Sequence, residues 1–132
     1  MSIEFRNAKG VPMPISDYSQ AAIVPAGARL VFVSGQVALN ERGELVGEGD
    51  AVRQTEQILD NIRRILEDAG GGISSLVSLT WYFTNMDDRA RILDVRKRAF
   101  AGHAPASTAV EVRRLAHPDW LVEIDCVAAL SG

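Results

Sequence analysis

The chain has 132 residues and a mass of 14.3 kDa, which is the size of one domain, and we predict a single domain over residues 1–132. Hydrophobic residues make up 47% and charged residues 23%, and these fractions exclude a disordered chain, a coiled coil and a collagen-like repeat. The formal net charge of −3 provides no basic field for a phosphate backbone, so we expect no nucleic-acid partner.

The N-terminus has no apolar core of the kind found in signal peptides. The apolar runs, such as residues 30–33, are far shorter than the ~20 residues that a membrane span requires. We therefore expect a cytoplasmic protein with no membrane partner. A domain of this size has a modest core of its own, which favours oligomerisation.

In chain order, short strands are predicted first at residues 3–6, 21–24 and 30–34. Pro25-Ala26-Gly27 lies between the last two strands, so we predict that they form an antiparallel hairpin. A turn is predicted at residues 40–44, where the sequence is Asn-Glu-Arg-Gly-Glu.

A helix is predicted over residues 50–69, because apolar residues recur there at helical spacing. Asp50 is placed to cap its first turn, and Gly70 is placed to end it in the left-handed conformation. A second amphipathic helix is predicted over residues 87–100. Its apolar residues are expected to point inward, and its arginines, Arg96 among them, to form a solvated face.

Residues 76–83, 107–112 and 120–127 are predicted strands, rich in β-branched and aromatic residues or alternating in polarity. The burial needs of all these elements are met by an α+β fold, with a mixed β-sheet and two helices packed on one face. The other face of the sheet would need a cover, and self-association is the simplest one.

Metal binding is poorly supported, and we predict no metal site. His103 and His117 lie far apart in the sequence, and Cys126 is the single cysteine. Each is expected to be structural, with Cys126 a small buried hydrophobic residue on a strand.

Glu123 and Asp125 share one face of the last strand, within an otherwise almost wholly apolar run. A carboxylate in such a place either pairs with an arginine such as Arg113 or is held for proton transfer with a raised pKa. Spacing alone favours the ion pair.

Two early segments resemble the opening signature of the Rid (reactive intermediate deaminase, YjgF) family. They are residues 18–21, Tyr-Ser-Gln-Ala, and residues 30–36, Leu-Val-Phe-Val-Ser-Gly-Gln. Further matching segments lie at residues 54–55, 59–62, 67–70, 84–88 and 121–124, so the resemblance covers nearly the whole chain. It implies a chorismate mutase-like fold and a homotrimer that packs its sheets into a central barrel, with clefts between subunits.

The best-known members of that family hydrolyse enamines and imines to a keto acid and ammonia without a cofactor. The resemblance implies a small-molecule cleft lined by Tyr18 and the Ser34-Gly35-Gln36 turn. It also implies that Glu123 positions or activates the water that attacks the C=N carbon. A family arginine that clamps the substrate carboxylate is replaced here by Ser107, and a family asparagine is replaced by Leu93.

The missing guanidinium removes a charged hydrogen bond that contributes roughly 1.5–3 kcal/mol. We therefore expect weak or absent 2-iminopropionate deaminase activity, and a cleft that takes a small, less anionic imine, enamine or carbonyl compound. One alternative is an active deaminase in which another arginine, such as Arg113 or Arg29, replaces the clamp. Another is a binding or regulatory module without turnover. The acidic charge disfavours ribonuclease action, a label often attached to the family.

Overall fold

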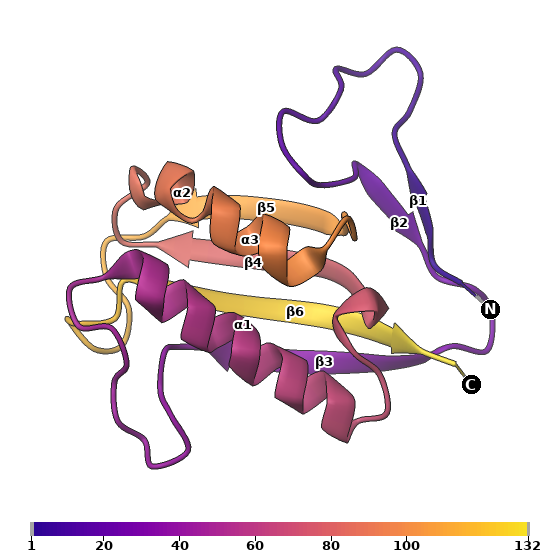
Figure 1. The fold of residues 1–132 in the computed structure, drawn as a ribbon. Coiled ribbons are helices and arrows are strands. Elements are labelled where there is room, and N and C mark those ends of the chain that lie inside the picture. The colour runs from indigo at the N-terminus through magenta and orange to yellow at the C-terminus, as the bar shows by residue number, and fades with distance from the viewer. Residues whose placement is uncertain (1, 132) are drawn as a thin grey trace.

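The computed structural model describes residues 2–131. Its elements in chain order are β1 (Glu4–Arg6), β2 (Ala21–Ile23), β3 (Arg29–Gln36), α1 (Ala51–Asp68), the short 3₁₀ turn η1 (Ile73–Ser75), β4 (Leu76–Phe83), α2 (Asp88–Arg91), α3 (Leu93–Phe100), β5 (Ala106–Glu111) and β6 (Val122–Leu130). Four strands form the main sheet in the order β3-β6-β4-β5, while β1 and β2 form a separate two-stranded ribbon (Figure 1).

The main sheet is mixed, because β6 runs antiparallel to both β3 and β4, whereas β5 runs parallel to β4. Helices α1 and α3 both lie on one face of this sheet (Figure 1). The predicted α+β fold is therefore confirmed. Within residues 2–131, no helix has the length and apolar character needed to cross a membrane.

Alternation along β6 separates a core face from an open face. Five residues of this strand are buried: Val122, Ile124, Cys126, Ala128 and Leu130. The residues between them are half-exposed and belong to the opposite face of the sheet. The buried face packs with α1 and α3 around large side chains such as Trp81 and Phe83.

The predicted hairpin between residues 21–24 and 30–34 is wrong. Strand β2 pairs with β1, where Phe5 lies opposite Ala22, and β3 pairs with β6, where Val33 lies opposite Cys126. The turn at residues 25–27 therefore joins two different sheets. The eight-residue β3 finds a partner of matching length in the nine-residue β6, which the three-residue β2 does not offer.

The predicted helix over residues 87–100 is divided at Ile92, whose backbone (φ −94°, ψ 0°) departs from helical values. The expectation that Arg96 is solvated is also wrong, since only 6% of it is exposed. Arg96 lies one turn after the buried Ile92 and therefore shares its inward face.

The predicted ends of α1 are confirmed. The Asp50 side chain accepts a hydrogen bond of 3.0 Å from the Arg53 backbone N–H, and Gly70 has a left-handed φ of +99°. Gly43, with φ +76°, forms the predicted turn at residues 40–44.

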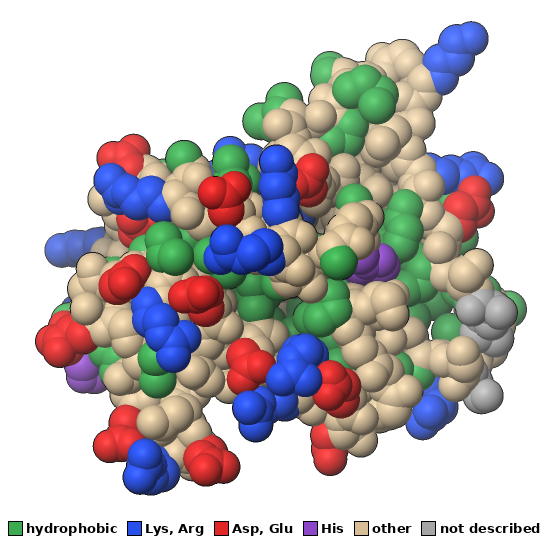
Figure 2. Space-filling model, viewed as in Figure 1, with side chains coloured by type: hydrophobic (Ala, Val, Ile, Leu, Met, Phe, Trp, Pro, Cys, Tyr) green, Lys and Arg blue, Asp and Glu red, His purple; other side chains and the backbone are tan. Residues whose placement is uncertain are grey.

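Residues 7–20 form an arm that leaves the body between β1 and β2 (Figure 1). Gln20 closes its base by accepting from the Ala8 N–H at 2.7 Å and donating to the Pro12 carbonyl at 2.6 Å. The arm carries exposed apolar side chains, whereas acidic and basic side chains are interspersed over the helical face (Figure 2).

Gln54 joins the start of α1 to the loop before β6. It is fully buried, and its Nε2 donates to the carbonyls of Gly47 and Asp119, each at 3.0 Å. Its Oε1 accepts from the Leu121 N–H at 2.9 Å. One amide thus satisfies three backbone groups and fixes the approach to β6.

We expect Gln54→Leu to lower the free energy of unfolding by on the order of 3 kcal/mol, because it leaves these backbone groups buried without partners. The measurement is urea unfolding followed by circular dichroism. The matched control is Gln57→Leu on the same helix, a half-buried position with a cost below about 1 kcal/mol. Equal losses in the two variants would contradict this role of Gln54.

Candidate functional site

Glu123 lies against Gly35 where β3 and β6 meet on the open face. The register of these strands shifts between Val33 and Gln36, which brings Gly35 beside the Glu123 side chain. A Cβ at Gly35 would overlap the Glu123 carboxylate oxygen Oε2 and lie 2.9 Å from its Cδ. Only glycine leaves room for the carboxylate in this place.

Within residues 2–131, Glu123 has no hydrogen-bond or ion-pair partner, so the predicted pairing with an arginine such as Arg113 is wrong. The pKa of Glu123 is raised above its ordinary value, mainly by partial burial and to a smaller extent by the negative charge of Asp125. The second possibility raised by the sequence, a carboxyl suited to proton transfer, is the one that the geometry supports.

The neighbours of Glu123 on β6 have separate roles. Asp125 accepts a 2.8 Å hydrogen bond from the Tyr82 hydroxyl, and this contact raises the pKa of Tyr82. Burial raises the pKa of the Cys126 thiol to about 12, so this cysteine remains protonated and unreactive. The structural role predicted for Cys126 is confirmed.

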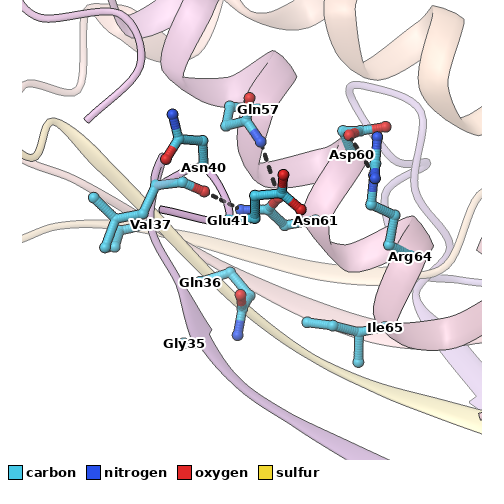
Figure 3. Close-up of a pocket in the computed structure, with 11 residues that line it drawn as sticks. Gly35, Gln36, Val37, Asn40, Glu41, Gln57, Asp60, Asn61, Arg64 and Ile65 are labelled. Carbon is cyan, nitrogen blue, oxygen red and sulfur yellow. Dashed lines mark hydrogen bonds and ion pairs between the residues drawn. The ribbon is translucent and has the colours of Figure 1, made fainter. Parts of the chain in front are cut away.

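A groove of about 700 Å³ lies on the other side of the Ser34-Gly35-Gln36 segment, between the end of β3 and α1 (Figure 3). Gly35 and Gln36 line it together with polar side chains of α1. Asn61 donates to the Leu39 carbonyl at 2.8 Å and accepts from Gln57 at 2.9 Å. These amides satisfy one another and shape the wall beside the predicted turn.

Tyr18 and Ser107 lie at the opposite edge of the sheet. Ser107 is on β5, and the segment after Tyr18 runs along the outer edge of that strand, where Ser19 bridges to Ala106. The Ser19 hydroxyl donates to the Ala104 carbonyl at 2.6 Å. Leu93, the other predicted contact, is the half-buried first residue of α3.

Arg96 of α3 reaches this second group of residues, although its sequence position predicted a solvated side chain. Its Nη2 donates to the Asp17 carbonyl at 2.7 Å, and its Nη1 lies 3.4 Å from the Ser107 Oγ. The guanidinium stacks over the rings of Trp81 and Phe100, 5.4 and 5.5 Å from their centroids. A guanidinium therefore lies beside Ser107 even though residue 107 has none.

The structure thus gathers the predicted residues into two groups. Ser34, Gly35, Gln36 and Glu123 lie at the β3–β6 side, and Tyr18 and Ser107 lie at the β5 edge. Glu123 lies on β6, two strand spacings or ~10 Å from β5. It belongs to the open face of the sheet, whereas Ser107 shares the core face with its buried partner Leu79. Within one chain, a small ligand at Glu123 therefore does not reach Ser107.

The two histidines have structural contacts. His103 Nε2 lies 2.8 Å from the Leu76 carbonyl and its ring meets Phe5 edge-on, while His117 packs near Trp120. In the part of the chain that the structure describes, no three His, Cys, Asp or Glu side chains cluster in a way that could hold a metal ion.

The fold and the site define a small α+β protein with a partnerless, half-buried carboxyl on the open face of its sheet. The model of the family described as "Endoribonuclease L-PSP" matches residues 9–130. The chain belongs to this family, which is the Rid family that its motifs indicated.

Similar proteins occur in bacteria and archaea. A RutC family protein of Pyrococcus abyssi is 39% identical over 118 residues, covering 89% of each chain. The 3-aminoacrylate deaminase RutC of Acinetobacter baylyi is 34% identical over 122 residues, covering 91% of this chain and 92% of that protein. A Yersinia pestis Rid family protein of unknown function has a crystal structure with TM-score 0.89 and 31% identity, covering 98% and 100% of the two chains.

We expect Gly35→Ala to displace the Glu123 carboxylate into solvent, because the added Cβ occupies its place. The pKa of Glu123, followed by carbon NMR of its carboxyl, should then fall toward its ordinary range of about 4. Gly72→Ala is the control, since Gly72 has an extended backbone and open space around it. An unchanged Glu123 titration in Gly35→Ala would contradict this geometry.

Proposed function

We propose that this protein hydrolyses a small imine or enamine in clefts between copies of the chain, with Glu123 activating the attacking water. Water adds to the C=N carbon, the C–N bond breaks, and a carbonyl compound and ammonia leave; an enamine first tautomerises to the imine. Glu123 takes one proton from the attacking water and passes it to the imine nitrogen. It then relays the hydroxyl proton of the resulting carbinolamine to the same nitrogen as the C–N bond breaks, so that ammonia carries both protons of the water. The reaction needs no cofactor.

The observation that carries this proposal is the environment of Glu123. A carboxyl with a raised pKa and without an ion-pair partner is suited to exchange protons with a ligand. Asp125 differs, because it is engaged by the Tyr82 hydroxyl. The name of the Acinetobacter relative supports the substrate class, since 3-aminoacrylate is an enamine.

A cleft between copies follows from the separation of the two residue groups. Tyr18 and Ser107 of one chain can join Gly35 and Glu123 only if the latter belong to a second chain. The open face offers an apolar surface for such an assembly at its other end, where Phe32 is 75% exposed and lies opposite Val127. We propose the homotrimer typical of the family.

The proposal predicts that the wild type accelerates hydrolysis of imines made in situ by an amino-acid oxidase. Glu123→Gln should lower kcat on the order of 10²–10⁴-fold, because it removes the proton-transfer group. Ammonia release measures both rates, and Glu48→Gln, at an exposed position, is the control. No acceleration of any imine by the wild type would refute the hydrolase. Tight ligand binding without turnover would instead show a binding module.

The raised pKa of Glu123 also predicts how stability depends on pH. The pKa of Glu123 is higher in the native state than in the unfolded chain, so the native state is favoured while this carboxyl is neutral. The free energy of unfolding therefore falls as the pH rises through the native pKa. We expect Glu123→Gln to raise Tm slightly at pH 7 and to match the wild type below about pH 4. Thermal unfolding across this range measures the effect. A lower Tm for the variant at pH 7 would contradict it.

Phe32→Asp should convert the trimer to smaller species, because it places a charge in the apolar part of the open face. Light scattering after size exclusion gives the mass, with three copies of the 14.3 kDa chain expected for the wild type. Arg98→Gln makes the same change in net charge at an exposed position of α3 and should leave the mass unchanged. A monomeric wild type would refute the trimer.

A further inference from the structure

Arg96 is a buried cation that contacts neutral groups rather than a carboxylate. It is 6% exposed, and within residues 2–131 it makes no salt bridge with any carboxylate. Asp17 offers it a backbone carbonyl, and Ser107 offers a hydroxyl at 3.4 Å, close to the limit of a hydrogen bond. Burial lowers the pKa of Arg96; the negative charge of Asp17 opposes this effect in part, and the positive charge of Arg89 adds to it.

Two buried donors at this position also lack acceptors. In the part of the chain that the structure describes, two buried side-chain polar atoms have no hydrogen-bond partner: Arg96 Nε and Trp81 Nε1. They belong to side chains that stack on each other. Burying a charge is costly unless it is paired, and stacking on aromatic rings offsets only part of that cost. These two unpartnered donors and the buried charge therefore favour the binding of an anion.

We infer that Arg96 binds the carboxylate of the ligand at the Tyr18–Ser107 side of the cleft, so that the protein acts on small anionic imines or enamines. Where the cleft lies rests on the proposed function. The guanidinium is planar, and its paired N–H groups match the two oxygens of a carboxylate. The Asp17 carbonyl holds Nη2 in place, while the long contact from Nη1 to Ser107 is readily exchanged for a ligand oxygen.

This inference differs from the expectation of a less anionic ligand, which assumed that Ser107 left its side of the cleft without a cation. It also differs from replacement by Arg29 or Arg113. Arg29 begins β3, six residues before Gly35, and both arginines are exposed. Among the arginines considered, Arg96 alone is both buried and in contact with Ser107.

The test compares a carboxylate with its neutral analogue, using calorimetric binding of pyruvate and of pyruvamide to the trimer. We expect the wild type to prefer pyruvate by about ten- to a hundredfold. Arg96→Gln should lose this preference with pyruvamide binding unchanged, and Arg96→Gln/Ser107→Arg should regain it. Arg98→Gln, on the solvent side of α3, should keep the full preference.

If Arg96→Gln does not fold, Arg96→Lys replaces it in the test, because lysine keeps the positive charge but lacks the planar pair of donors. Arg96→Lys should weaken the binding of pyruvate and leave the binding of pyruvamide unchanged. If pyruvate and pyruvamide affinities change equally in the folded variants, Arg96 does not bind the carboxylate. Tighter, Arg96-dependent binding of inorganic phosphate than of pyruvate would also overturn the inference. If the preference for pyruvate depends on Arg96 but no imine is hydrolysed, only the proposed hydrolase activity is refuted. If imines are hydrolysed at the same rate with and without Arg96, only the role of Arg96 is refuted.

Discussion

The period-two alternation of β6 is the constraint on which the rest of this structure depends. This strand lies inside the sheet, so its even-numbered residues from Val122 onward fill the core while the odd-numbered ones face the other way. A slip of one residue would drive Glu123 and Asp125 into the core, at a cost of several kcal/mol per charge. The core thus fixes the register, and the register fixes where the candidate carboxyl lies.

Periodicity is also what made most of the fold predictable from sequence. The stripe on α1 and the alternation on β4 and β6 each identify an element and its buried face. Partner choice is different, because it depends on residues far apart in the chain. Pro25-Ala26-Gly27 correctly indicates a reversal, but a local turn carries no information on whether β3 pairs with β2 or with β6.

Part of the candidate site was likewise predictable from the sequence, and part was not. Glu123 stood out as a carboxylate in an apolar strand, so its importance was visible in the sequence. The reason that residue 35 is glycine was not visible, because it arises from a contact across a register shift, between Gly35 and a residue 88 positions later in the chain. Arg96 was predicted to be solvated because it is an arginine. Ile92, Val95 and Ala99 nevertheless define a buried helical face to which residue 96 also belongs. Geometry there outweighed the usual exposure of arginine.

Arg96 and Ser107 together show why a motif transferred position by position is an incomplete guide to a site. A ligand meets atoms in space, and the same guanidinium can be delivered from a strand or from the helix packed over that strand. Serine at residue 107 leaves room for a long side chain from α3, and the rings of Trp81 and Phe100 hold that side chain flat against the sheet. Serine at residue 107 and the burial of Arg96 are therefore parts of one arrangement, which places a positive charge beside the β5 edge of the sheet.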